Sequence, residues 1–330
     1  LSLANGYKLI VVERHQASSD GSAEPLFGKA INRALEQLGY ALLDGYRFYR
    51  AVAPQLILES HQLYRLARHH GLLGCRVDEG DEQDTAASVA MLYHAMMLLS
   101  LTDPFRLAEG EVGLLSEVLM QHAASCRIIP GNSWSGDGEG LFLIDLCSDR
   151  LPAPCNALGS PLQADDPCLL DATAALTAVR EQLEKTPDRV RMQSPEAMVL
   201  RRLLPDAQGT DKRREQRSPD SRWVNLLPGV NVIHQYLTHT ARKEPGRPAA
   251  EDSGQPDELI TCRVLDSSQD GMKLACDDSS AGDARVGDLL GIMEGQGSHQ
   301  SLLLAMIRFI RIYREGGMEA GVQLMPGGLG

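Results

Sequence analysis

The sequence predicts an α+β protein: a mostly helical N-terminal domain with a small β element, followed by a small antiparallel β-barrel. Two observations lead to this fold class. Apolar residues recur at intervals of three and four over much of the first 204 residues, which is typical of helices that bury one face. From residue 258 onward, short apolar runs alternate with polar turns, which is typical of antiparallel strands.

The first part of the chain is expected to begin with a short strand over Lys8–Glu13. A helical pattern then runs from Leu26 to about Ala67, and Pro54 should divide it because proline lacks a backbone donor. The most apolar run, Thr85–Leu101, contains two serines and a histidine and is short for a bilayer span. We therefore expect a buried core helix there and no membrane span.

Later N-terminal elements follow from capping and turn signals. Thr102-Asp103-Pro104 is a helix-start pattern, so a helix is expected from Phe105 towards Ala124. The glycine-rich stretch Gly131–Gly140 separates two apolar runs and is interpreted as a hairpin loop between them. The two strands are Cys126–Ile129 and Leu141–Leu146, and two further helices are expected near Leu170–Glu184 and Ser194–Leu204.

Composition changes abruptly after residue 204. Residues 205–221 are polar and basic, as expected of a linker, so the predicted domains are 1–204 and 222–330, joined by 205–221. A short helix is expected over Val230–His239. The barrel strands are expected at Leu259–Leu265, Gly271–Cys276, Asp288–Met293, Ser301–Tyr313 and Glu319–Met325.

Charge and cysteine content restrict the class of protein. The net charge of −12 argues against a general nucleic-acid binder, because contact with a phosphate backbone needs a basic surface. The seven cysteines are scattered and form no C-x-x-C pair, which favours reduced thiols in a cytoplasmic protein over a disulfide framework or a zinc site. No metal and no cofactor is therefore expected.

Two segments carry the chemistry that the sequence offers. The linker contains Arg213-Arg214-Glu215-Gln216-Arg217, an R-x-x-x-R pattern whose planar guanidinium groups suit phosphate oxygens and can stack on bases. The barrel contains Asp266, Ser268 and Gly271 in a D-x-S-x-x-G pattern between two expected strands. Taken alone, the basic run fits solvated charge and the second pattern fits a β-turn.

In this order, the two patterns and the following strands resemble the PilZ family of bacterial cyclic di-GMP receptors. The resemblance covers about residues 212–325 and includes Val286-Gly287-Asp288, Ile307-Arg308 and Gly321–Leu324. It implies that cyclic di-GMP is the ligand. It also implies that Arg213, Arg214 and Arg217 bind the ligand together with the barrel residues Asp266, Ser268 and Gly271.

The spacing departs from the family pattern. Arg217 and Asp266 are 49 positions apart, so Trp223–Glu258 would be an insertion that carries a helix. A second basic cluster, Arg242-Lys243 with Arg247, lies nearer to the barrel motif but lacks the x-x-x spacing between arginines. Either basic cluster could supply the arginines that bind the ligand. We prefer the R-x-x-x-R segment.

The sequence thus leads to a non-enzymatic cyclic di-GMP effector that acts in motility, type IV pili or biofilm control. Ligand binding is expected to reorient the helical domain, which would then meet a protein partner. The alternative is an interaction adaptor whose PilZ-like barrel has lost nucleotide binding. A third hypothesis, an enzyme in residues 1–204, has no catalytic constellation in the sequence to support it.

Overall fold

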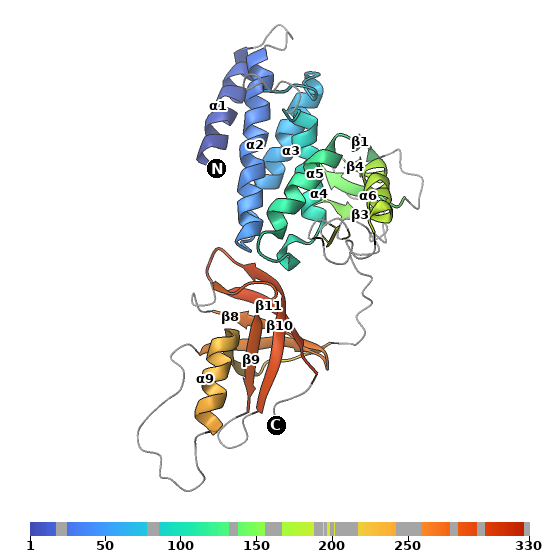
Figure 1. Ribbon diagram of the computed structural model, residues 1–330. Helices are drawn as coiled ribbons and strands as arrows, with labels where there is room; N and C mark the ends of the chain where they lie inside the picture. Colours follow the sequence, from blue (N-terminus) through green and yellow to red (C-terminus); the bar gives the residue numbers. More distant parts are fainter. Residues whose placement is uncertain are drawn as a thin grey trace. The chain divides into compact units, whose positions relative to one another are not determined.

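The computed structural model divides the chain into two compact units (Figure 1). Unit 1 comprises Leu1–Phe48, Val52–Pro104 and Gly110–Thr210, and unit 2 comprises Tyr49–Ala51, Phe105–Glu109 and Asp211–Gly330. The structure describes residues 1–17, 25–77, 86–131, 138–155, 167–187, 194, 197–198, 201, 217–241, 259–277, 283–295 and 301–326.

Unit 1 begins with the helices α1 (Ser2–Ala17), α2 (Pro25–Arg47), α3 (Leu56–His69) and α4 (Val89–Leu101). The division between α2 and α3 confirms the break expected at Pro54. Helix α4 is apolar on nearly all sides and is buried, as its sequence predicts. It begins at Ser88, whose hydroxyl accepts a hydrogen bond from the backbone N of Met91 at 3.3 Å. Within the described part of the chain, no helix is both long and apolar enough to cross a membrane.

Two expectations for these elements were wrong. The strand expected at Lys8–Glu13 is part of helix α1, in which Val11 is buried while Leu9 and Val12 are exposed. A short apolar run does not distinguish a strand from one turn of helix by periodicity alone. The helix expected to begin at Phe105 begins later. Pro104–Arg106 form a 3₁₀ turn instead, and helix α5 spans Glu111–Ala123. Gly110, directly before α5, adopts the left-handed conformation (φ 83°), which glycine tolerates.

The β element of unit 1 has four strands in the order β1 (Arg127–Pro130), β4 (Pro167–Asp171), β2 (Leu141–Asp145) and β3 (Ala153–Pro154). The expected hairpin between Cys126–Ile129 and Leu141–Leu146 was wrong, because β4 lies between β1 and β2 and pairs antiparallel with both. Cys168, Leu169 and Leu170 are buried, which suits a central strand. Helix α6 (Thr173–Lys185) follows and begins three residues later than expected.

Unit 2 contains a closed antiparallel barrel of six strands. In the order of pairing these are β7 (Ile260–Ser267), β6 (Trp223–Pro228), β9 (Leu289–Glu294), β10 (Ser301–Ile312), β11 (Met318–Leu324) and β8 (Gly271–Cys276), and β8 pairs back with β7. The five strands expected after residue 258 are all present within one or two residues of the expected bounds. Closure leaves no free edge among the six strands.

The segment expected as a helical insertion also supplies a barrel strand. Residues Trp223–Pro228 form β6, which pairs with β7 and β9, and helix α9 (Gly229–Ala241) follows it directly. This helix packs on the barrel through Val232 and Ile233, which form an apolar cluster with Leu227, Met293 and Leu302. The insertion proper is therefore shorter than the sequence suggested.

The expectation of seven reduced thiols was also wrong. Cys262 and Cys276 form a disulfide, and both side chains are buried. They are directly opposed in the register of β7 and β8, with their Cα atoms 4.4 Å apart, which lies within the range that a disulfide can span. The pairing depends on strand register and not on cysteine spacing, so the sequence pattern alone did not indicate it. The other five cysteines form no disulfide.

Candidate functional site

The candidate site lies where the segment that precedes β6 runs along β7. The short strand β5 (Ser218–Pro219) places Ser218 opposite Ser267 and Pro219 opposite Asp266. Just before it, the Arg217 guanidinium contacts the Asp266 carboxylate at 2.7 Å, across 49 residues of sequence. Both side chains are about 30% exposed, so the pair is accessible to a ligand from solvent.

A tight turn at Asp220 holds this segment against β7. The Asp220 carboxylate accepts hydrogen bonds from the backbone N of Arg222 and from the Ser267 hydroxyl, each at 3.1 Å. The backbone N of Asp220 donates to the carbonyl of Leu265, also at 3.1 Å. The backbone hydrogen bond from Arg222 is the main reason that the pKa of Asp220 is lowered; burial opposes this shift, and the hydrogen bond from the Ser267 hydroxyl adds to it. This anchoring fixes the position from which Arg217 projects.

Arg222 is a second arginine at this edge of the barrel, and sequence reasoning did not single it out. Its guanidinium contacts Asp220 at 3.3 Å and Glu294, at the end of β9, at 3.0 Å. Its charge is thus committed to two carboxylates of the protein. In the sequence, Arg222 is marked only by its place directly before a strand. Surface arginines are common at such places, so this position did not indicate a site residue.

The turn between β7 and β8 is built by Ser268 and Gly271. The backbone N of Ser268 donates to the Gly271 carbonyl at 2.8 Å, and the Ser268 hydroxyl lies 3.3 Å from the same oxygen. A Cβ atom at Gly271 would approach the backbone oxygen of Val322, on β11, to 2.4 Å. Glycine is therefore required here by the close approach of a neighbouring strand.

A lysine adds positive charge beside the acidic end of β7. Lys273 is opposite Asp266 in the β7–β8 register, after an irregularity between Val264 and Asp266. Its ammonium group forms an ion pair with Glu319 at 3.0 Å. The site therefore alternates cations and carboxylates over a short stretch of barrel surface, and an anionic ligand would have to compete with these internal partners.

Four of the six residues singled out by the sequence are thus placed together: Arg217, Asp266, Ser268 and Gly271. Arg213 and Arg214 lie outside the described residues. The competing basic cluster of Arg242, Lys243 and Arg247 lies outside them as well. Of the arginines in the two candidate clusters, the structure describes Arg217, and it contacts the D-x-S-x-x-G motif directly.

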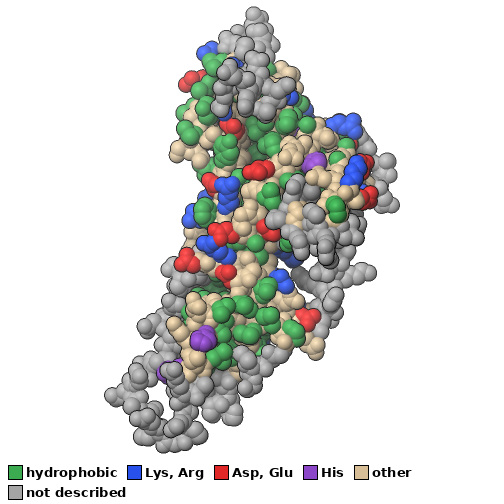
Figure 2. All heavy atoms as spheres, viewed as in Figure 1, with side chains coloured by type: hydrophobic (Ala, Val, Ile, Leu, Met, Phe, Trp, Pro, Cys, Tyr) green, Lys and Arg blue, Asp and Glu red, His purple; other side chains and the backbone are tan. Residues whose placement is uncertain are grey.

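The surface supports a local site over an extended one. On the face shown in Figure 2, basic and acidic side chains are interspersed and do not gather into a field of one sign. A protein that tracks a nucleic-acid backbone needs a basic stripe or patch. The described residues on this face form no such stripe or patch.

Comparison with known proteins gives two family matches. Residues 234–327 match the middle PilZ domain of the cyclic-di-GMP receptor FimW, and residues 1–131 match the N-terminal domain of the same receptor. The cyclic-di-GMP receptor FimW of Pseudomonas aeruginosa is 23% identical over 388 aligned positions, which cover 98% of this chain. The alignment covers 63% of that relative, so the chain spans less than two thirds of its length.

Proposed function

We propose, on the premise that the C-terminal region is a PilZ domain, that this protein is a receptor for cyclic di-GMP without catalytic activity. The relative from Pseudomonas aeruginosa carries the name of such a receptor. The observation that supports the proposal is the contact between Arg217 and Asp266 at 2.7 Å, because it brings the last arginine of the R-x-x-x-R segment to the first residue of the D-x-S-x-x-G segment.

The expected binding mode follows from the chemistry of these side chains. Arg217, together with Arg213 and Arg214, would donate paired hydrogen bonds to the ligand's phosphates and stack on its guanine rings. Asp266 and the Ser268 hydroxyl would meet a base edge or a phosphate from the barrel side. Gly271 keeps the turn compact, so that no side chain obstructs the ligand at this position.

Binding should exchange one ion pair for another. In the structure the Arg217 guanidinium is directed to a carboxylate, and a phosphodiester of the ligand, which also carries one negative charge, would offer it two oxygens for paired hydrogen bonds. Asp266 would then be available to accept hydrogen bonds from a guanine base. Because the side chains are partly exposed, salt should weaken the interaction measurably.

The consequence we propose is a change in the relative orientation of the two units. Arg213 and Arg214 belong to the segment that precedes the barrel, so a ligand that contacts them would connect that segment to β7. Unit 1 would then present a different surface to a protein partner in the cytoplasm, in the control of motility, type IV pili or biofilm. Small-angle X-ray scattering of the full chain with and without ligand tests this step, and identical profiles at saturating ligand would contradict it.

A filter-binding competition tests the receptor proposal itself. Radiolabelled cyclic di-GMP should be retained by the full chain and displaced by excess unlabelled cyclic di-GMP, but not by GTP or cyclic di-AMP. Equal displacement by all three would indicate nonspecific anion binding. If no label is retained, the adaptor with a barrel that does not bind nucleotide becomes the better account.

A further inference from the structure

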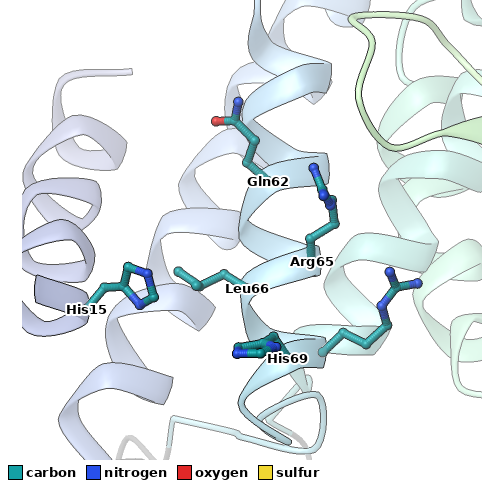
Figure 3. A pocket seen from close by; sticks show the side chains of 6 residues that line it. His15, Gln62, Arg65, Leu66 and His69 are labelled. Atoms are coloured by element: carbon teal, nitrogen blue, oxygen red, sulfur yellow. The ribbon is translucent and has the colours of Figure 1, made fainter. Parts of the chain in front are cut away.

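The exposed arginines of the two units differ in how far their side chains are already engaged. Figure 3 shows a pocket in unit 1 that is lined by His15 of α1 and by residues of α3, among them Arg65 and Arg68. Both arginines are held by interactions within the protein. On the barrel, Arg263 of β7 is exposed, and its side chain forms neither a hydrogen bond nor an ion pair with the described residues. Its guanidinium group is therefore available to a ligand.

Trp223, at the start of β6, lies directly beside Arg263. The two residues are partners in the antiparallel register of β6 and β7. The backbone N of Val264 donates to the Arg222 carbonyl at 2.9 Å, which makes Trp223 and Arg263 a non-hydrogen-bonded pair. In such pairs the Cα atoms are about 4.5 Å apart and the side chains are closest. The indole and the guanidinium group therefore project from adjacent points of the sheet.

Arg263 and Asp266 share the outer face of the barrel. In β7, Arg263 stands between the buried Cys262 and Val264, so its side chain points outward. The irregularity after Val264 shifts the alternation, and Asp266 becomes the partner of the partly exposed Lys273 on β8. At about 3.3 Å per residue, the three positions from Asp266 to Arg263 span about 10 Å at most. The candidate site thus continues along β7.

Trp223 is unusually exposed for an aromatic residue in a barrel strand. Its side chain is 61% exposed. Helix α9 covers the outer face of β6 at the other end of the strand, where Val232 and Ile233 pack with Leu227. This cover stops short of Trp223. An exposed indole beside a guanidinium group forms a platform on which a nucleobase can stack.

We propose that Trp223 and Arg263 bind the second guanine of cyclic di-GMP and make the site specific for that base. This inference rests on the proposed function and extends its site along β7. The ligand carries two guanines, so a base held at Asp266 leaves the other free to reach Trp223. The face of this second guanine lies on the indole, and Arg263 donates paired hydrogen bonds to its O6 and N7 atoms. Adenine has an amino group in place of O6 and cannot accept both bonds.

Tryptophan fluorescence tests the stacking directly. The chain contains two tryptophans, Trp134 and Trp223, so the variant Trp134→Phe leaves Trp223 as the single reporter. A guanine stacked on the indole should quench its emission, with a midpoint equal to the dissociation constant from calorimetry of the same variant. Calorimetric binding with unchanged Trp223 emission would overturn this inference and leave the receptor proposal intact. Absence of calorimetric binding by the natural chain would overturn both.

Two substitutions of Trp223 separate stacking from folding. Trp223→Ala should raise the dissociation constant for cyclic di-GMP at least about tenfold, whereas Trp223→Phe, which keeps an aromatic face, should stay within about threefold of the natural chain. Because Trp223 is exposed, both variants should keep the circular dichroism of the natural chain. Equal affinities of the two variants would contradict the stacking.

Selectivity between two cyclic dinucleotides tests the role of Arg263. Cyclic GMP–AMP keeps one guanine for the Asp266 end and brings adenine to Trp223. The natural chain should bind cyclic di-GMP at least about tenfold more tightly than cyclic GMP–AMP, and this ratio should fall towards one in Arg263→Gln.

The matched control is Arg314→Gln, which removes an exposed arginine from the turn between β10 and β11. It should keep the selectivity of the natural chain. Equal affinity of the natural chain for the two ligands, unchanged selectivity in Arg263→Gln, or an equal loss in Arg314→Gln would show that Arg263 does not read the base.

Discussion

Arg217 and Asp266, which are 49 residues apart in the sequence, form an ion pair at 2.7 Å because the chain before β6 lies antiparallel along β7. The long stretch of chain between Arg217 and Asp266 argued against one binding site that contains both residues. Their contact shows that the two side chains lie together despite this separation. Part of that length forms barrel strand β6 and helix α9, and the pairing of β5 with β7 brings the two motifs together.

Replacing Arg217 with alanine should weaken cyclic di-GMP binding strongly. The lost hydrogen bonds to a charged group are worth about 1.5–3 kcal/mol, so the dissociation constant should rise roughly tenfold to a hundredfold. Arg217 and Asp266 are partly exposed, so their pair should contribute less than about 1 kcal/mol to folding. The variant should therefore unfold near the temperature of the natural chain in calorimetry.

The control for this prediction is Arg247→Ala, which removes one arginine of the competing basic cluster. It should leave the affinity within about twofold, since this cluster is not expected to contact the ligand. The opposite result, with normal binding in Arg217→Ala and loss in Arg247→Ala, would show that the second cluster supplies the ligand arginines.

Gly271→Ala should destabilise the barrel. The added Cβ would lie 2.4 Å from the backbone oxygen of Val322, and a backbone atom cannot move aside without disturbing the β8–β11 pairing. Overpacking of this kind costs about 1–3 kcal/mol. Urea denaturation of the barrel measures it, with Gly74→Ala as the control, because a Cβ at Gly74 meets no atom within 4 Å. Equal midpoints for the two variants would contradict the close approach.

Thiol counting tests the disulfide between β7 and β8. Alkylation of the unfolded, unreduced chain should modify five cysteines, and prior reduction should raise the number to seven, as read by intact mass. Reduction should also destabilise unit 2 by about 3 kcal/mol, because the bond closes a loop of 14 residues. Seven modified cysteines without reduction would show that Cys262 and Cys276 are free.

The stability of unit 1 should fall as the solution is acidified. Burial lowers the pKa of His61 from 6.5 to about 4, against the raising effects of an Arg150 backbone hydrogen bond and of Asp145 and Asp149. Between these pH values the unfolded chain binds a proton that the folded chain refuses. This group alone should remove up to about 3 kcal/mol of stability by pH 4.

Urea denaturation followed by helical circular dichroism at several pH values measures this effect. His61→Gln should flatten the dependence on pH, although it also loses the contact of the His61 Nδ1 atom with the Tyr93 hydroxyl at 2.7 Å. Direct NMR titration of the His61 ring is the decisive check, and a value near 6.5 would contradict the burial argument.

The sequence predicted the barrel well because its strands are short, regularly spaced and bounded by turn residues. It missed β6, since Trp223 and Asn225 point outward and the strand ends directly at a helix. It also placed a strand at Lys8–Glu13, where packing against α2 selects a helix. A local pattern does not determine an element's type when tertiary contacts complete the element.

The candidate site was predicted in part. Asp266, Ser268 and Gly271 lie within six residues of one another at the turn between β7 and β8, so their proximity follows from the local sequence. The approach of Arg217 depends on β5 pairing with β7, which is a contact between distant segments and has no local signal. The anchor at Asp220 was missed for the same reason, because its partner Ser267 lies 47 residues away.

Calorimetric titration of cyclic di-GMP into the full chain tests the central claim most directly. We predict saturable binding with one dissociation constant in the micromolar range or tighter, and a weaker constant when the salt concentration is raised. Absence of binding heat and of any competition at several hundred micromolar ligand would contradict the account and leave the barrel as an interaction module.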